Sequence, residues 1–421
     1  MLGWTLKGPL WARRSNEPTD GARREHNLEA KSSRTGALLA LHRTGRPMWT
    51  PRDYGSLARE GYARNPIVYR SIRMISEAAG SVPLLCQMDG ERFTDHPALQ
   101  LLAHPNARQG GADWFEGLFG HLLVSGNAYV EAVFGSLDLM ELHCLRPDRM
   151  KVVPGPEGWP EAYDYTVGGK CLRFDQSDPD SVIPPILHLT LFNPQDDHYG
   201  FSPLEASQTS IDVHNAAASW NKALLDNSAR PSGALVYAAS EAGNLTNEQF
   251  ERLKKELEEG YQGAMNAGRP LLLEGGLDWK SMSLSPKDMD FMEAKNGAAR
   301  EIALAFGVPP MLLGIPGDNT YANYAEANRA FWRQTVLPLA SRCLQSLARW
   351  LSPAYDAPFD LKIDLDQISA LASERETLWR RVGAADFLTE EEKRIAVGYT
   401  AKGPDWPDNP DDDSSSDAGG K

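Results

Sequence analysis

The sequence predicts an α+β fold. Three observations indicate it. Long helical patterns occupy much of the chain, short extended runs broken by Gly and Pro fill residues 126–191, and the composition is that of an ordinary globular protein, with 42% hydrophobic and 24% charged residues. At 421 residues the chain is long enough for two or three folding units.

The first helices and strands have clear sequence signals. Asn65 is a suitable cap for a helix that starts at Pro66 and ends at Gly80, and a second helix is expected from Asp113 to Ser125. A strand-like run, SVPLLCQM, lies between them. After Ser125 the predicted strands are NAYVEAVF, MELHCLR, MKVVPG, EAYDYTV and PILHLTLF.

A long helix is predicted from Pro203 to Ser228. Ser202 and Glu205 form an S-x-x-E capping box around Pro203, which suits the first helical position. Apolar residues then repeat every seven positions, a seam that packs against another long helix of the same chain or of a neighbouring copy. Its members are Leu204, Ile211, Ala218 and Leu225.

Residues 230–284 read as a small insert between two long helices. A capping box at Thr246 and Gln249 opens a helix, and two strand-like runs, RPLLLEGG and LDWKSMSL, flank a Gly-Gly turn. We expect the insert to contain one apolar helix face and an aromatic strand residue. These residues are Phe250, Leu253, Leu257, Tyr261 and Trp279.

Two further helices are joined by a loop rich in Gly and Pro. The first runs from Pro286 to Phe306, with Ser285 as its cap and Gly307 as its stop. The second is expected from Asn323, as an N-x-x-E cap, to Leu351, with a kink at the internal Pro338. Towards the C-terminus, TEEEKRIA predicts a short capped helix.

No pattern predicts catalysis, a metal site or a cofactor. The loop sequence GDNT lacks the Lys of a phosphate-binding P-loop. Three histidines, His143, His188 and His198, have no ligand spacing typical of a metal site, so they are interpreted as ordinary strand and loop residues. A two-metal nuclease built on Asp288, Asp290 and Glu293 is disfavoured because those positions do not share a helix face.

Charge and cysteine content limit the alternatives further. The formal net charge is −14, which disfavours a protein that grips DNA through Lys and Arg and suits either solubility or a non-adhesive DNA channel. No apolar run is long enough to span a bilayer, so no membrane contact is expected. The four cysteines form no C-x-x-C pair and are interpreted as core thiols. They are Cys86, Cys144, Cys171 and Cys343.

Six runs in order resemble one protein family. The longest is GVPPMLLGIPGDNTYANYAEANRAFW, and the others are NPIVYRSIRMISEAAGSVPL, GNAYVE, YGFSPLEAS, WNKALLDNSARPSGALV and NAGRPLLLEGGLDWKSM. Together they resemble the portal proteins of long-tailed double-stranded DNA phages, including prophage and gene-transfer-agent relatives. The similarity extends over most of the chain, from about Tyr54 to Leu351.

The resemblance implies a portal fold with a wing, a helical stem, a small α/β clip, a tunnel loop, a kinked tunnel helix and a short helical crown. Two terminal segments complete the layout, a flexible arm and a disordered tail with six aspartates. The expected boundaries are 1–46 for the arm, 47–201 for the wing, 202–229 for the stem helix, 230–284 for the clip, 285–307 for the second stem helix, 308–322 for the tunnel loop, 323–352 for the tunnel helix and wing, 353–403 for the crown and 404–421 for the tail.

The resemblance also implies a function. A portal protein forms a ring, expected to have twelve subunits, at one capsid vertex, and its channel passes double-stranded DNA during packaging and ejection. The implied partners are the large terminase motor, a head–tail adaptor and the major capsid protein. The protein would be a non-enzymatic part of a virion or phage-like particle, assembled in the bacterial cytoplasm. A non-channel head–tail adaptor or scaffold, or a metal-dependent nuclease, remains the alternative.

Specific residues acquire expected roles from the resemblance. The seam at Leu204, Ile211, Ala218 and Leu225 is expected to lie between subunits, and the insert residues named above are expected to form the clip. The tunnel loop is expected to face DNA through Leu313, Gly314, Ile315, Gly317, Asp318, Asn319, Thr320, Tyr321 and Asn323.

Overall fold

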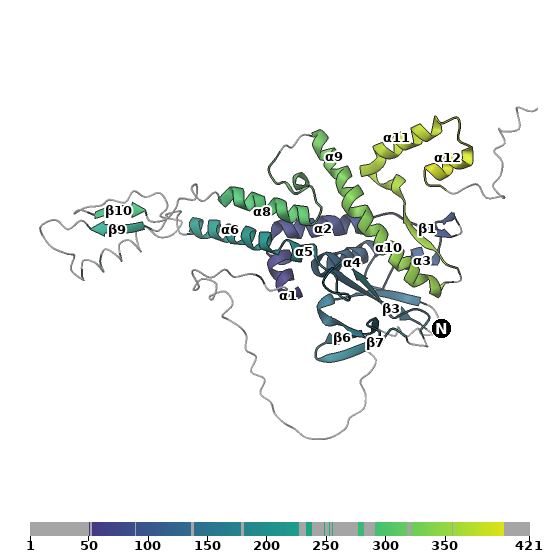
Figure 1. The fold of residues 1–421 in the computed structure, drawn as a ribbon, viewed down its shortest axis with the longest axis horizontal. Coiled ribbons are helices and arrows are strands. Elements are labelled where there is room, and N and C mark those ends of the chain that lie inside the picture. The colour runs from purple at the N-terminus through teal and green to yellow at the C-terminus, as the bar shows by residue number, and fades with distance from the viewer. Residues whose placement is uncertain are drawn as a thin grey trace, which may run out of the picture. The chain divides into compact units, whose positions relative to one another are not determined.

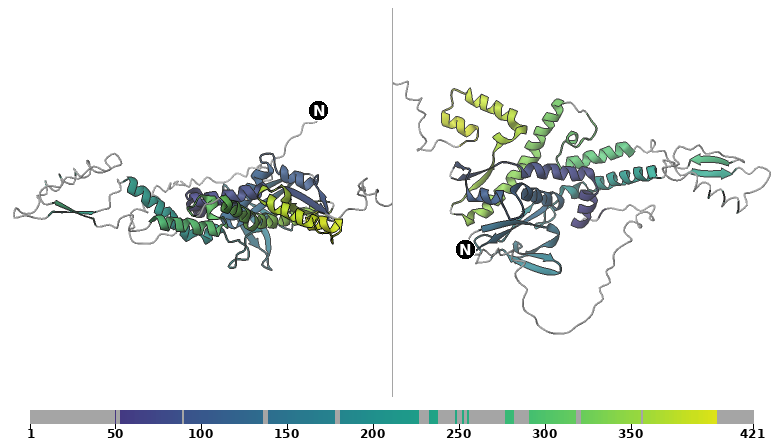
Figure 2. Two further views of the ribbon diagram at one scale, coloured as in Figure 1. Left: turned by 90° about the horizontal axis from the view of Figure 1, so that it is seen from above. Right: turned by 180° about the vertical axis from the view of Figure 1, so that it is seen from behind.

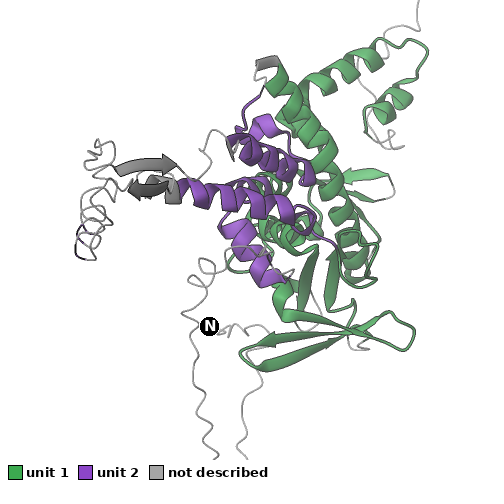
Figure 3. Cartoon of the chain, turned by 60° about the vertical axis from the view of Figure 1, so that its left-hand side comes forward, with its two compact units in different colours: residues 1–15, 73–200, 321–421 green, residues 16–72, 201–320 purple. Residues whose placement is uncertain are grey.

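The computed structural model describes residues 50, 53–88, 90–135, 139–177, 181–226, 233–237, 248, 252, 255, 277–281, 291–317, 321–355 and 357–399 (Figure 1). The chain divides into two compact units (Figure 3). Unit 1 comprises residues 1–15, 73–200 and 321–421, and unit 2 comprises residues 16–72 and 201–320. The predicted N-terminal arm and acidic tail lie outside the described residues.

The described part of unit 1 contains three antiparallel sheets of three strands each, so the predicted mixture of helices and small sheets is confirmed. The first sheet has the order β11 (Asp360–Ile363), β1 (Leu84–Met88), β2 (Glu91–Phe93). The second has the order β4 (Leu139–Leu145), β3 (Asn127–Phe134), β8 (Ile186–Thr190). The third has the order β5 (Met150–Pro154), β6 (Pro160–Val167), β7 (Lys170–Asp175).

The helices of unit 1 bury the apolar faces that the sequence predicts. In α4 (Gly111–Ser125), Trp114, Leu118 and Leu122 are buried, and Gly126 ends the helix in the left-handed conformation with φ 75°. The remaining α-helices lie before α4 and after residue 320. They are α3 (Pro97–Ala103), α9 (Tyr321–Phe331), α10 (Leu337–Leu351), α11 (Ala372–Gly383) and α12 (Glu390–Ala396).

The tunnel-helix region is interrupted near Pro338, as predicted, but the interruption has an unexpected form. A π-helical segment, Trp332–Val336, separates α9 from α10, and Pro338 lies in the first turn of α10. Val336, before α10, is itself helical, so Pro338 lies within a continuous helix, where it cannot donate to the preceding turn, and the wider π segment accommodates the missing hydrogen bond. The predicted cap at Asn323 is wrong, because α9 already begins at Tyr321.

Three strands of unit 1 were not expected from the sequence. They are short and lie at sheet edges, where β2, β7 and β11 each pair with one neighbour only within the described sheets. β7 follows a turn in which Gly168 and Gly169 both have positive φ, and its burial pattern is mostly exposed. Cys171 on this strand is exposed, so its interpretation as a core thiol is wrong.

Unit 1 has an aromatic cluster between its sheets, built around Tyr129. Tyr129 packs with Tyr163, and the ring of His188 stacks on it at a centroid distance of 4.2 Å. The Nε2 atom of His188 lies 3.1 Å from Oδ1 of Asn127. Burial, with a smaller contribution from His198, lowers the pKa of His188 to about 4, so the folded state favours the neutral ring.

This environment predicts a pH dependence of stability. The folded-state pKa of His188 lies below the unfolded value of about 6.5. The stabilisation that its neutral ring contributes is therefore fully present above pH 6.5 and is lost as the pH falls towards 4. The free energy of unfolding should decrease between pH 6.5 and 4, and we expect this decrease to be smaller in His188→Gln by on the order of 2 kcal/mol. Urea unfolding across this range tests it, with His104→Gln at an exposed position as the control. An unchanged slope would contradict the role given to His188.

The described part of unit 2 is mostly helical. Its helices are α1 (Tyr54–Leu57), the π-helix η2 (Ala58–Ala63), the first half of α2 (Pro66–Gly80), α5 (Pro203–Ala206), α6 (Gln208–Asp226), α8 (Phe291–Ala305) and the 3-10 helix η5 (Pro310–Leu313). The predicted cap of α2 is confirmed, since Oδ1 of Asn65 accepts hydrogen bonds from the backbone of Ile67 and Val68. Two strands, β9 (Gly233–Tyr237) and β10 (Leu277–Ser281), pair antiparallel.

The long predicted helix after residue 202 begins where expected but is not continuous. Ser202 caps α5 by accepting from the backbone N–H of Leu204, with Pro203 at the first position. The helix breaks at Ser207, and α6 starts at Gln208. The cap was therefore predicted correctly, and the interruption was not.

Candidate functional site: the paired helices and the loop after them

Two helices of unit 2, α6 and α8, lie side by side (Figures 1 and 2). They are antiparallel, because Ser210 at the start of α6 donates to Oε2 of Glu301 near the end of α8 at 2.5 Å. Most of the buried side chains of α8 are small. The buried positions of α8 are Ala298, Ala299, Ile302 and Ala303.

The seam on α5 and α6 is buried by the chain itself. Leu204 is 1% exposed and Ile211 is 2% exposed, and the side chain of Leu204 lies directly against Gly61. The expectation that these two positions lie between subunits is therefore wrong. Ala218 is half-buried, and the side chain of Leu225 lies outside the described residues.

A buried polar network fixes α6 against the start of α2. The side-chain amide of Asn65 donates to Oδ1 of Asn215 at 3.0 Å and lies 3.2 Å from Nδ1 of His214. Asn215 in turn donates to the backbone carbonyl of Glu60 at 2.8 Å. Burial lowers the pKa of His214, with a smaller effect from Lys295, so the network favours a neutral ring. The sequence indicated Asn65 only as a cap, because partners about 150 residues away leave no local signal.

The end of α8 turns the chain into the loop through glycine. Gly307 has φ 67°, and its N–H donates to the carbonyl of Leu304 at 3.0 Å. The next N–H, from Val308, donates to the carbonyl of Ala303 at 2.9 Å. This pair of bonds is a Schellman motif, so the predicted stop at Gly307 is confirmed and has a defined geometry.

The first half of the loop is packed onto α8. Ile315 is 4% exposed and lies in one apolar cluster with Ala299 and Ala303, with Leu313 packed against it. The guanidinium of Arg300 also donates a hydrogen bond to the carbonyl of Pro316. Ile315 therefore cannot face DNA, because its side chain fills the chain's own core, and that prediction is wrong.

The structure describes some of the other residues predicted to face DNA and not the rest. Gly314, with φ 72°, and Gly317 are exposed. Asn323 is exposed on α9. The predicted contacts Asp318, Asn319 and Thr320 lie outside the described residues, as does the side chain of Tyr321.

Most of the predicted clip also lies outside the described residues. Trp279 is on β10, where its backbone pairs with Leu235 of β9. The side chain of Trp279 and the helix-face residues Phe250, Leu253, Leu257 and Tyr261 are not described.

The three histidines considered as metal ligands occupy separate environments. His188 packs in the aromatic cluster, while Nε2 of His143 lies 2.9 Å from a carboxylate oxygen of Glu141. His198 is part of the loop that follows β8, where its backbone N–H donates to Asp196. Among the residues that the structure describes, no group of three or more His, Cys, Asp or Glu is arranged to hold a metal ion. Nor does any described helix have the length and apolar character needed to cross a membrane.

The phage portal protein family matches residues 66–398 of the chain. The chain belongs to the phage portal protein family. This portal protein is also 28% identical to the probable portal protein of Streptomyces phage phiC31, over 84% of this chain and 81% of the phage protein.

Solved structures agree with this membership. The portal protein is 57% identical to a chain in the neck of an empty gene transfer agent particle computed with C6 symmetry, with a TM-score of 0.68. That match covers 87% of this chain and 100% of the other. A second match, to the neck of the native particle computed with C12 symmetry, has 56% identity and a TM-score of 0.66 and covers 87% and 99% of the two chains.

These findings confirm the resemblance stated from the sequence. As a member of this family, the protein is a structural component that forms a homo-oligomeric ring at a capsid vertex around a DNA channel.

Proposed function

We propose that twelve copies of this portal protein form the ring and that α6 and α8 are its stem. The observation that carries the proposal is the antiparallel helix pair, which encloses the insert 227–290 and leads directly into an anchored loop. The C12 symmetry of the related neck particle supports the number twelve. At twelve subunits the formal ring charge would be 12 × (−14) = −168, so assembly should depend on salt.

The surface between neighbouring stems is proposed to lie on the exposed side of α6, in place of the seam at Leu204 and Ile211. Val213 is 41% exposed and Trp220 is 45% exposed. The two are seven residues apart, so they lie on one helix face. An apolar stripe of this kind gives a neighbouring copy a surface to cover.

The DNA-facing part of the loop is proposed to be its second half. Arg300 and Ile315 fix the first half of the loop against α8, so the chain is positioned up to Pro316, where these contacts end. Asp318, Asn319, Thr320, Tyr321 and Asn323 follow. The neutral amide and hydroxyl groups among them can touch phosphates without the long-lived grip of Lys or Arg.

The insert between the stem helices is proposed to be the clip that docks the large terminase motor and a head–tail adaptor. The part of the predicted wing that lies in unit 1, residues 73–200, is proposed to contact the major capsid protein. We place assembly in the bacterial cytoplasm, followed by incorporation into a virion or phage-like particle.

Changing Asn319 and Thr320 together to Lys tests the loop proposal. We expect rings to form but DNA passage to slow, most strongly at low salt, where phosphate attraction is least screened. The measurement is the rate and length of DNA packaged by particles containing the variant, across ionic strength. The matched control, Asn319→Gln with Thr320→Ser, should package like the wild type. Equal packaging by the lysine variant at every salt concentration would show that the loop does not face DNA.

A further inference from the structure

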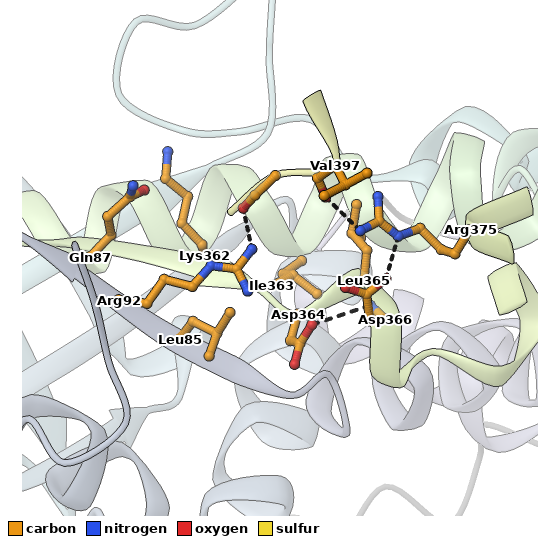
Figure 4. A pocket seen from close by; sticks show the side chains of 11 residues that line it. Leu85, Gln87, Arg92, Lys362, Ile363, Asp364, Leu365, Asp366, Arg375 and Val397 are labelled. Carbon is orange, nitrogen blue, oxygen red and sulfur yellow. Dashed lines mark hydrogen bonds and ion pairs between the residues drawn. The ribbon is translucent and has the colours of Figure 1, made fainter. Parts of the chain in front are cut away.

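One face of the β1–β2–β11 sheet in unit 1 forms the wall of a small pocket (Figure 4). Cys86 of β1 is fully buried on the other face of this sheet. Because side chains alternate along a strand, the neighbouring Leu85 points to the pocket, as does Lys362, which is opposite Leu85 in the register of β11. Val397 and Gly398, which follow α12, complete a cavity of about 190 Å³.

The pocket has a positive charge, although the whole chain has a formal net charge of −14. It is lined by three cations and two carboxylates, and both carboxylates already have partners. The guanidinium of Arg375 lies 2.5 Å from Oδ1 of Asp366, and Asp364 accepts a hydrogen bond from the side chain of Gln367 at 2.7 Å. The charged residues of the lining are Arg92, Lys362, Arg375, Asp364 and Asp366.

The other two cations, Arg92 and Lys362, are not neutralised in this way. Arg92 donates to the carbonyl of Gly398 and stacks 4.1 Å from the ring centre of Tyr399, but within the described residues it forms no ion pair with a carboxylate. Lys362 lies 3.8 Å from Oδ2 of Asp360, and both of these side chains are more than half exposed, so the pair contributes little. The pocket therefore favours a ligand that carries further carboxylates.

The chain itself continues from this pocket into an acidic segment. Residues 400–421 contain six aspartates and two lysines, a balance of 2 − 6 = −4. Within them, Asp405-Trp406-Pro407-Asp408 places one large apolar side chain between two carboxylates. Asp405 is six residues beyond Tyr399, and six extended residues span about 20 Å, which is enough to return to a pocket that Gly398 lines.

We propose that the acidic segment Asp405–Asp408 docks in this pocket of its own chain. The indole of Trp406 packs on the apolar part of the lining, and the two flanking carboxylates pair with Arg92 and Lys362. An acidic motif with one aromatic anchor is suited to a cationic pocket with apolar walls. The apolar lining residues are Leu85, Ile363, Leu365 and Val397.

The docked segment has two consequences for unit 1. Neither α11 nor α12 contains a buried residue, and helices this short are marginal in water, so a segment held across the end of α12 stabilises them. The segment also occupies two cations that would otherwise bind phosphate groups. Because it is tethered, its effective concentration is on the order of millimolar, and a weak contact is sufficient. The contact does not depend on the proposed ring.

Zero-length crosslinking of the full chain tests the proposal. A carbodiimide joins a carboxylate to an amine where the two are in contact, and mass spectrometry identifies the joined peptides. We expect Lys362 to be joined to Asp405 or Asp408 about tenfold more often than the exposed Lys151 and Lys170 are. Equal yields at the three lysines would overturn the proposal.

Substitution of Trp406 separates docking from general charge attraction. Trp406→Ser keeps both carboxylates but removes the apolar anchor, so the yield at Lys362 should fall about fivefold. The matched control, Trp406→Phe, should retain most of the wild-type yield. A Trp406→Ser yield equal to that of the wild type would contradict a docked segment, because charge attraction alone would then explain the crosslink.

Mixing labelled and unlabelled chains tests whether the segment belongs to the same chain. Chains labelled with ¹⁵N are mixed 1:1 with unlabelled chains before assembly and are then crosslinked. Docking within one chain predicts that both peptides of each Lys362 product carry the same label. Products in which about half of the peptide pairs are of mixed label would overturn the proposal, because the segment would then come from a neighbouring copy.

The acetylation rate of Lys362 gives a readout that does not require crosslinking. Replacing Asp405 and Asp408 together by Asn should raise this rate about threefold relative to that of Lys151 in the same sample, because the amine loses its carboxylate partner. High salt should raise the wild-type rate towards that of the variant, since it screens the same pair. An unchanged rate in the variant would contradict the pairing of the segment with Lys362.

Discussion

Replacing Ile211 with Asp is expected to unfold unit 2 rather than to release folded monomers. Ile211 is 2% exposed in the single chain, on the helix that pairs with α8. An unpaired carboxylate at such a position costs about 3–5 kcal/mol, a large part of the 5–15 kcal/mol that stabilises a typical domain. Circular dichroism and thermal unfolding of the purified variant provide the measurement.

A second substitution on the same helix provides the control for Ile211→Asp. Val213 is 41% exposed, so Val213→Asp places the same charge two residues away in contact with water. We expect this variant to keep the wild-type melting temperature in its unassembled form. A folded, monomeric Ile211→Asp protein with normal thermal stability would instead mean that the seam is covered by a neighbouring subunit.

Gly200→Ala is expected to destabilise unit 1 by about 3 kcal/mol or more, although it adds only one methyl group. A Cβ at position 200 would lie 2.0 Å from the carbonyl oxygen of Gly126 and 2.7 Å from the backbone nitrogen of Leu191. Both neighbours are backbone atoms that are already hydrogen-bonded to each other, because the Leu191 N–H donates to the carbonyl of Gly126 at 2.8 Å. The methyl group therefore forces the chain at the start of β3 and the end of β8 to move.

The position of Gly200 also anchors a hydrogen bond that the substitution would break. Its N–H donates to Oδ1 of Asn127 at 2.8 Å, and the same oxygen lies 3.1 Å from His188. Chemical denaturation of Gly200→Ala, compared with Gly117→Ala in α4, tests the account. A Cβ at Gly117 meets no atom within 4 Å, and alanine favours helix, so this control should be neutral or more stable by up to about 1 kcal/mol. Equal stability of the two variants would contradict the close backbone approach.

The features predicted well from the sequence are those determined by neighbouring residues. The caps at Asn65, Ser202 and Thr389 and the stop at Gly307 depend on side chains within a few positions, and each is present as predicted. Strand β3 has the predicted bounds for the same reason, since Gly126 precedes it and Gly135 follows it.

What the sequence could not determine depends on distant partners. A heptad seam indicates that a helix face will be buried, but not whether the same chain or another chain buries it. Ile211 is buried by its own chain. Ile315 belongs to a Gly- and Pro-rich loop, so its burial depends on Ala299 and Ala303 one helix earlier. Strand β11 is four residues long and pairs with β1 about 280 residues away, Leu84 opposite Ile363, which leaves no local pattern.

The measurement that tests the central claim most directly is the mass and shape of the assembled full-length protein. Twelve chains of 46.4 kDa give 12 × 46.4 = 557 kDa, and negative-stain class averages should show a ring with a central hole. Mass photometry on the same sample should give one peak at that mass, and the fraction of protein in this peak should depend on the salt concentration. A compact oligomer without a hole, or a chain that stays monomeric at every concentration and salt, would contradict a portal ring.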